Sequence, residues 1–141
     1  MYSFDENALT GELGVLSSRA RIAFAAAAAT RQLVNFERLA RESDAGSAQR
    51  PREITVQLWT DLQAAAIDRA AWSARLDEVM NLLPEESDDW VIGHALADDA
   101  LSSLAYVIRC LLTPEPQEAA WAARRAYEAA DQAAIRVLAV Q

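Results

Sequence analysis

Apolar residues recur at steps of three and four positions through most of this 141-residue chain. That spacing places them on one face of an α-helix, whereas a half-buried β-strand would alternate apolar and polar residues. No run shows convincing alternation, and 4 glycines and 4 prolines are too few for a fold with many tight turns. Alanine, the strongest helix former, occurs 31 times. The sequence therefore predicts an all-α protein.

Cap and turn residues divide this pattern into helices. Asp68 is expected to break or bend a long segment, because the apolar stripe resumes on a new phase at Trp72. The first expected helix runs from Ser3 or Asp5 to about Leu16, and the second from Ser17 or Ser18 to about Glu42. A third runs from about Pro51 to the break at Asp68, and a fourth from there to Leu83. The last two cover about residues 90–112 and 117–139. We expect five or six antiparallel helices in a bundle, as a single domain over residues 1–141.

The apolar stripes name the residues expected to face the core. They include Ile22, Ala26, Ala29, Leu33 and Phe36 in the second helix, Ile54, Leu58, Leu62 and Ala65 in the third, and Ala120, Ala123 and Tyr127 in the last.

The charge of the chain limits its partners. It has 13 basic residues, all of them arginine, and 21 acidic residues, for a formal net charge of −8. Binding to nucleic-acid phosphates or to an anionic membrane requires a basic surface. We therefore expect neither nucleic acid nor a membrane as a partner.

The ends of the chain and its apolar runs indicate where the protein resides. Acidic residues stand near the N-terminus, where a secretory signal needs positive charge. The longest apolar run, residues 22–29, is far shorter than the roughly 20 residues that span a bilayer. Cys110, the single cysteine, cannot form an internal disulfide. We expect a cytoplasmic protein.

Residues suited to catalysis are scarce. The sequence has no glycine-rich phosphate loop, no His-Glu-x-x-His pair and no calcium-binding loop. His94 and Asp98 share a helix face and could bind a metal, but this common spacing favours a histidine bonded to its helix neighbour. Cys110 lies among apolar residues and is expected to be buried and unreactive. Three aspartates are expected to face water: Asp61, Asp68 and Asp77. We predict no catalytic residue, no metal and no cofactor.

An acidic segment followed by an aromatic residue is the strongest candidate for a binding site. One interpretation is a solvated turn that caps the next helix; the other is a docking patch for a basic protein, with Trp90 as its anchor. Trp121, beside the stripe of the last helix, is a second candidate anchor. The candidate partner-binding residues are Glu85, Glu86, Asp88, Asp89, Trp90 and Trp121.

Four short segments form a recognisable set: FAAAAATRQLVNF at residues 24–36, LWTDL at 58–62, Pro84 with the Asp88-Asp89-Trp90 turn, and the alanine- and aspartate-bearing helix over 95–112. Together they resemble the YjaG-like bacterial family of unknown function. The likeness covers about Arg21 to Ala134, although valine stands at position 34, where the family usually has proline.

The resemblance implies an all-helical fold with no established activity, and a genomic association with histidine kinases and signalling. Asn35, Trp59 and Asp61 match its motif positions. We interpret these three residues first as specifying the fold and second as a shared site.

Four functional classes remain open on this sequence. The first is an inhibitor of the immunity type, a small acidic module that neutralises a basic effector protein. The second is a signalling adaptor associated with a histidine kinase system. The third is an enzyme that uses carboxylates or a metal in the bundle core, although the sequence lacks the Glu-x-x-His pairs of di-metal bundles. The fourth is a scaffold, for which the alanine- and tryptophan-bearing faces could form a homodimer. The acidic charge and the acidic segment place the inhibitor first, as a protein-binding module without enzymatic activity.

Overall fold

The computed structural model describes residues 4–42, 49–83 and 92–140. Over these ranges the chain forms helices and no strand, which confirms the all-α prediction. The six helices are α1 (Glu6–Gly14), α2 (Ser18–Glu42), α3 (Gln49–Ala64), α4 (Arg69–Leu82), α5 (Ile92–Leu112) and α6 (Pro116–Val140).

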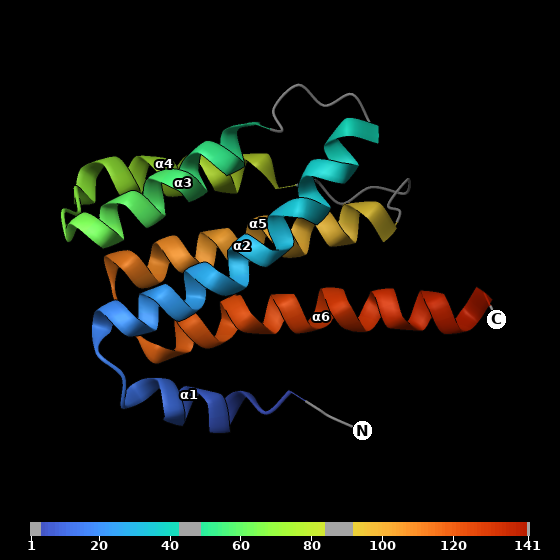
Figure 1. The fold of residues 1–141 in the computed structure, drawn as a ribbon, viewed down its shortest axis with the longest axis horizontal. Coiled ribbons are helices and arrows are strands. Elements are labelled where there is room, and N and C mark those ends of the chain that lie inside the picture. Colours follow the sequence, from blue (N-terminus) through green and yellow to red (C-terminus); the bar gives the residue numbers. More distant parts are fainter. Residues whose placement is uncertain (1–3, 43–48, 84–91, 141) are drawn as a thin grey trace.

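The helices alternate in direction along the chain (Figure 1). Helices α2 and α5 lie in the middle of the bundle, with α3 and α4 on one side and α6 and α1 on the other (Figure 1). The ends of α1, α3 and α5 meet the starts of α2, α4 and α6 at one end of the bundle (Figure 1). We call this the connection end, because it holds the three short links at residues 15–17, 65–68 and 113–115.

Side-chain caps set the starts of three helices. Asp5 accepts a hydrogen bond from Ala8 N at 3.0 Å, and Ser17 Oγ accepts one from Ala20 N at 3.1 Å. Asp68 accepts one from Ala71 N at 3.1 Å, which confirms the predicted break; this carboxylate caps α4 and is exposed, as expected. An exposed first turn leaves backbone N–H groups without partners, and these oxygens satisfy one in each helix.

The break between α3 and α4 also shows that one residue of the predicted apolar stripe lies outside the core. Ala65 was expected in the core, but it is exposed and follows the last residue of α3 with a φ of 52°. This left-handed conformation ends the helix, so the buried stripe of α3 stops at Leu62.

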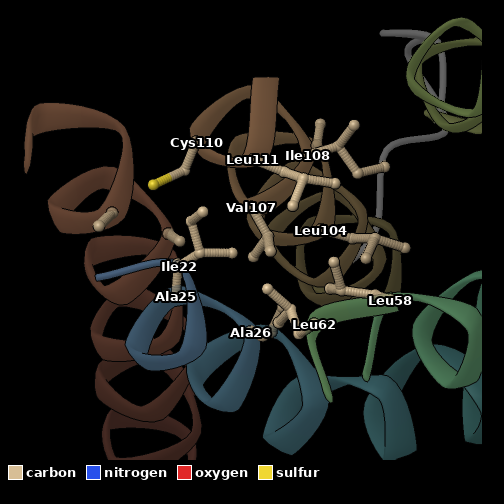
Figure 2. Packing of buried hydrophobic residues seen from close by; sticks show 14 of the residues in the cluster. Ile22, Ala25, Ala26, Leu58, Leu62, Leu104, Val107, Ile108, Cys110 and Leu111 are labelled. Atoms are coloured by element: carbon tan, nitrogen blue, oxygen red, sulfur yellow. The ribbon is translucent and has the colours of Figure 1, made fainter. Parts of the chain in front are cut away.

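The core forms where α5 meets α2 and α3. From α5 come Leu104, Val107, Ile108, Cys110 and Leu111, which pack against Ile22, Ala25 and Ala26 of α2 and Leu58 and Leu62 of α3 (Figure 2). Ala25 and Ala26 are fully buried, so the backbones of α2 and its neighbours approach closely. Of the stripe expected on α2, the residues whose side chains the structure describes are all buried: Ile22, Ala26, Ala29, Leu33 and Phe36.

The stripe of α6 is rotated from the predicted one. Ala119, Ala120 and Ala122 are fully buried, whereas Tyr127 is 38% exposed. The ring of Tyr127 packs on Phe4, which lies just before α1, with 5.7 Å between ring centroids.

A matched pair of valines tests the central position of α5. We expect Val107→Ala, at a fully buried site, to lower the free energy of unfolding by roughly 2 kcal/mol, because it leaves a cavity. Val56→Ala, at a site 58% exposed on α3, should change it by less than about 0.5 kcal/mol. Urea unfolding measures both changes, and equal losses would contradict a core centred on α5.

Candidate partner-binding face

Most of the predicted docking patch lies outside the described residues. This holds for Glu85, Glu86, Asp88, Asp89 and Trp90. Position 94 is described as part of α5 and position 35 as part of α2, but the side chains of His94 and Asn35 are not described. Trp121, the remaining candidate, lies on α6 and is partly exposed.

Trp121 is packed against a tyrosine from the neighbouring helix. Its ring lies 5.5 Å from that of Tyr106 on α5, between centroids, with the planes tilted by 46°. The guanidinium of Arg109 lies over the ring of Tyr106, 5.7 Å from its centroid. Two aromatic rings and a cation are therefore held together at the α5–α6 surface.

Ion pairs fix the arginines around these rings. Arg109 Nη2 lies 2.8 Å from a carboxylate oxygen of Glu118. Arg124 lies 3.0 Å from Glu6 and 3.1 Å from Glu128, so it joins α6 to α1 as well as to its own next turn. We define the aromatic face as Tyr106, Arg109, Trp121, Arg124 and Arg125.

Arg125 anchors the face to the interior. Its Nη1 lies 3.1 Å from Asp98 Oδ2 and 3.0 Å from Asp99 Oδ1. The side chain of Asp99 is only 5% exposed, and its second oxygen has no hydrogen-bond partner among the described residues. Burial raises the pKa of Asp99, and the hydrogen bond from Arg125 offsets only part of that effect.

Further polar contacts join α5 and α6 below the face. The hydroxyl of Ser103 donates to the carbonyl of Ala122 at 2.8 Å, and both residues are buried. Gln32 of α2 is also buried, and its amide, oriented to suit its neighbours, lies 3.2 Å from the carbonyl of Arg125. These contacts hold the two helices in one register, and with them the two rings of the face.

Two hollows flank the rings. One, of about 310 Å³, is lined by Trp121, Arg124 and Glu128 together with Tyr106 and Arg125. The other, of about 260 Å³, shares Tyr106 and Arg125. Its remaining lining residues are Met80, Leu83, Asp98, Ser102, Ala105 and Arg109. The acidic segment begins at position 85, only two residues after Leu83.

A family model described as "Protein of unknown function (DUF416)" matches residues 9–132. The chain belongs to this family. No curated protein and no solved structure matches the chain. The DUF416 match confirms a family of unknown function, and nothing connects it to the YjaG name.

Two of the three motif positions in this DUF416 chain make contacts between helices. Trp59 Nε1 donates to Thr30 Oγ1 at 3.0 Å, which ties α3 to α2. Asp61 accepts from Trp72 Nε1 at 2.8 Å, which ties α3 to α4, and from Gln57 at 2.7 Å. Asp61 was expected to face water, but both of its carboxylate oxygens accept hydrogen bonds within the protein. These contacts support the interpretation that the motif specifies the fold.

The remaining candidates for chemistry are few in the described ranges of the DUF416 chain. Cys110 is buried as expected, and burial raises the pKa of its thiol to about 11. Within the part of the chain that the structure describes, no three metal-ligating side chains come together. In the same ranges, no helix is both long and apolar enough to span a bilayer.

Sequence reasoning identified Trp121 but missed its partners. Tyr106, Asp99 and Arg125 were not singled out, because their contacts join residues at least 15 positions apart. The available signal was a pair of adjacent aspartates, Asp98 and Asp99, in an apolar helix and a pair of adjacent arginines, Arg124 and Arg125, in the next.

The buried carboxylate predicts a pH dependence of stability. Because the native pKa of Asp99 is raised, the native state binds more protons than the unfolded state above the ordinary aspartate pKa of 3.8. Stability relative to an Asp99→Asn variant should therefore fall as the pH rises through the raised pKa.

Urea unfolding of both proteins from pH 3 to 8 measures this difference. Asp98→Asn is the matched control, since Asp98 meets the same arginine but its side chain is 29% exposed. A wild-type protein that gains stability over Asp99→Asn with rising pH would show instead that the Arg125 ion pair outweighs burial.

Proposed function

We propose that this chain is a non-enzymatic protein-binding module that recognises a basic partner protein through the aromatic face, and that it acts as an inhibitor of the immunity type. The observation that carries the proposal is the Tyr106–Trp121 pair, partly exposed between two hollows and bordered by ion-paired arginines. Tryptophan, tyrosine and arginine supply a large share of the energy at protein interfaces, where they fill pockets on the partner.

The face is organised before any partner arrives. Arg109, Arg124 and Arg125 are each held by a carboxylate, and all of the face stands on two packed helices. Each rotamer-rich side chain that binding must immobilise lowers affinity by roughly 0.5–1.5 kcal/mol. The existing ion pairs remove much of that cost, which supports a binding function.

Charge supports a basic partner. The chain has a net charge of −8, and on the aromatic face the arginines are neutralised by carboxylates. The acidic segment begins two residues after Leu83, which lines one of the hollows. Complementary charge speeds the encounter of two proteins and selects between partners.

A binding role without catalysis is consistent with the state of the reactive groups. The carboxylates Asp98, Asp99 and Glu128 are engaged by arginines, and Asp61 is bonded by Trp72 and Gln57. The thiol of Cys110 is buried and has a raised pKa.

The tryptophan tests the face directly. The tagged chain is used to capture partners from its own cells, and the captured protein is identified and titrated. We expect Trp121→Ala to weaken binding at least tenfold, as for an interface anchor. Tyr127→Ala, a change to a 38% exposed aromatic on the same helix, should leave affinity unchanged.

The identity of the captured protein decides the class. A basic protein that is toxic when expressed alone supports the inhibitor, whereas a kinase or response regulator would replace it with the adaptor. Equal affinity of both variants and wild type would reject the aromatic face.

The acidic segment is tested by charge reversal. We expect Asp88→Arg combined with Asp89→Arg to slow association with a basic partner and to reduce the dependence of that rate on salt. The double reversal Glu12→Arg with Asp77→Arg, at exposed positions on α1 and α4, makes the same change in net charge. Equal slowing by both double variants would show an effect of net charge alone, without a docking patch.

A further inference from the structure

The connection end brings three helix C-termini together. Helices α1, α3 and α5 all end there (Figure 1). The last turn of a helix leaves carbonyl groups without partners in the helix, and these carry a partial negative charge. No basic residue stands in the last turn of α1 or of α3.

Arginines from other helices satisfy these carbonyls. Arg21 of α2 donates to the carbonyls of Leu13 and Leu16, each at 3.0 Å, and also to that of Pro114. Arg69, the first residue of α4, donates to the carbonyl of Leu112 at 2.7 Å.

Arg19 of α2 is held less tightly. Its Nη2 donates to the carbonyl of Gln63, at the end of α3, at 3.4 Å. Among the described residues, neither Arg19 nor Arg69 contacts a carboxylate, in contrast to the arginines of the aromatic face. A guanidinium has five N–H donors, so both side chains keep most of their capacity for an anion.

Both arginines line one apolar hollow of about 340 Å³. Its floor includes Ile22, Leu62 and Leu111, which belong to the core cluster (Figure 2). Ile67, in the link between α3 and α4, is 36% exposed and completes the apolar lining. The hollow therefore combines an apolar lining with two guanidiniums that contact no carboxylate in the described ranges.

We propose that this hollow binds a small amphipathic anion, with a carboxylate head on the guanidiniums of Arg19 and Arg69 and a short apolar chain on the floor. The volume is at the lower end of the range for small-molecule sites, about 300–1,000 Å³. The net charge of −8 favours a small ligand over an acidic protein, because a protein would also meet the negative remainder of the surface.

This site is independent of the protein-binding function. The hollow shares no residue with the two that flank Tyr106 and Trp121. A failure of either proposal therefore leaves the other standing, and Trp121→Ala should bind the small anion as wild type does.

Titration of the full chain with octanoate, followed by calorimetry or NMR, tests the proposal. We expect saturable binding of one octanoate, with a Kd on the order of 1 mM for a ligand of this size. The neutral probe 1-octanol should bind at least tenfold more weakly. Octanol binding as tight as octanoate, or no saturable octanoate binding, would overturn the proposal.

Variants then locate the site. Arg19→Gln combined with Arg69→Gln should weaken octanoate binding at least tenfold. Arg31→Gln combined with Arg38→Gln makes the same charge change at two exposed positions farther along α2, and should leave it unchanged. Equal losses in both double variants would contradict an anion site at the connection end.

A second variant guards against misfolding. Arg19 and Arg69 also cap helix ends, so circular dichroism must first show that their double variant is folded. Ile67→Glu places a carboxylate in the hollow at a partly exposed position and should abolish octanoate binding without unfolding the chain. Unchanged binding in a folded Ile67→Glu variant would overturn the proposal.

Discussion

The burial of α5 is the constraint on which the rest of the fold depends. Between Ala97 and Leu111 nearly every side chain of this helix is buried, against α2, α4 and α6. A helix enclosed on several sides must satisfy its polar groups within the protein. Asp99 meets Arg125 and Ser103 meets the carbonyl of Ala122, and both partners lie on α6. These bonds set the position of α6 along α5, and the aromatic face follows from that position.

The connection end shows how a bundle with alternating helices uses its cations. Arginine in the first turn of a helix is unfavourable with respect to that helix's own dipole. In an antiparallel bundle, however, the first turn of one helix lies beside the last turn of its neighbours. Arg21 and Arg69 therefore stand at the starts of α2 and α4 but bond the carbonyls that end α1 and α5. The unfavourable position in one helix is offset by capping of another.

Features that depend on local spacing could be predicted from the sequence. The helices, the cap at Asp68 and the buried stripe of α2 follow from residues within one or two turns of each other. Ala65 was assigned to the core incorrectly because its left-handed conformation ends α3 just before it. Tyr127 was assigned incorrectly because the extent of a buried stripe also depends on how far the neighbouring helices cover it. The pair of Asp99 and Arg125 spans 26 positions between two helices. No local pattern identifies such a pairing, so only Trp121 of the site could be named in advance.

Because the chain has no lysine, arginine supplies the positive charge both on the aromatic face and at the connection end. All 13 basic residues are arginine, whose planar guanidinium can bond a carboxylate and still stack on a ring. On the aromatic face, Arg109 does both, with Glu118 and with Tyr106, and the result is a fixed, neutralised surface suited to a protein partner. At the connection end, Arg19 and Arg69 bond backbone carbonyls and contact no carboxylate among the described residues. An arginine that pairs with a carboxylate within the fold therefore has its charge neutralised, whereas one that bonds a carbonyl is still able to bind an anion.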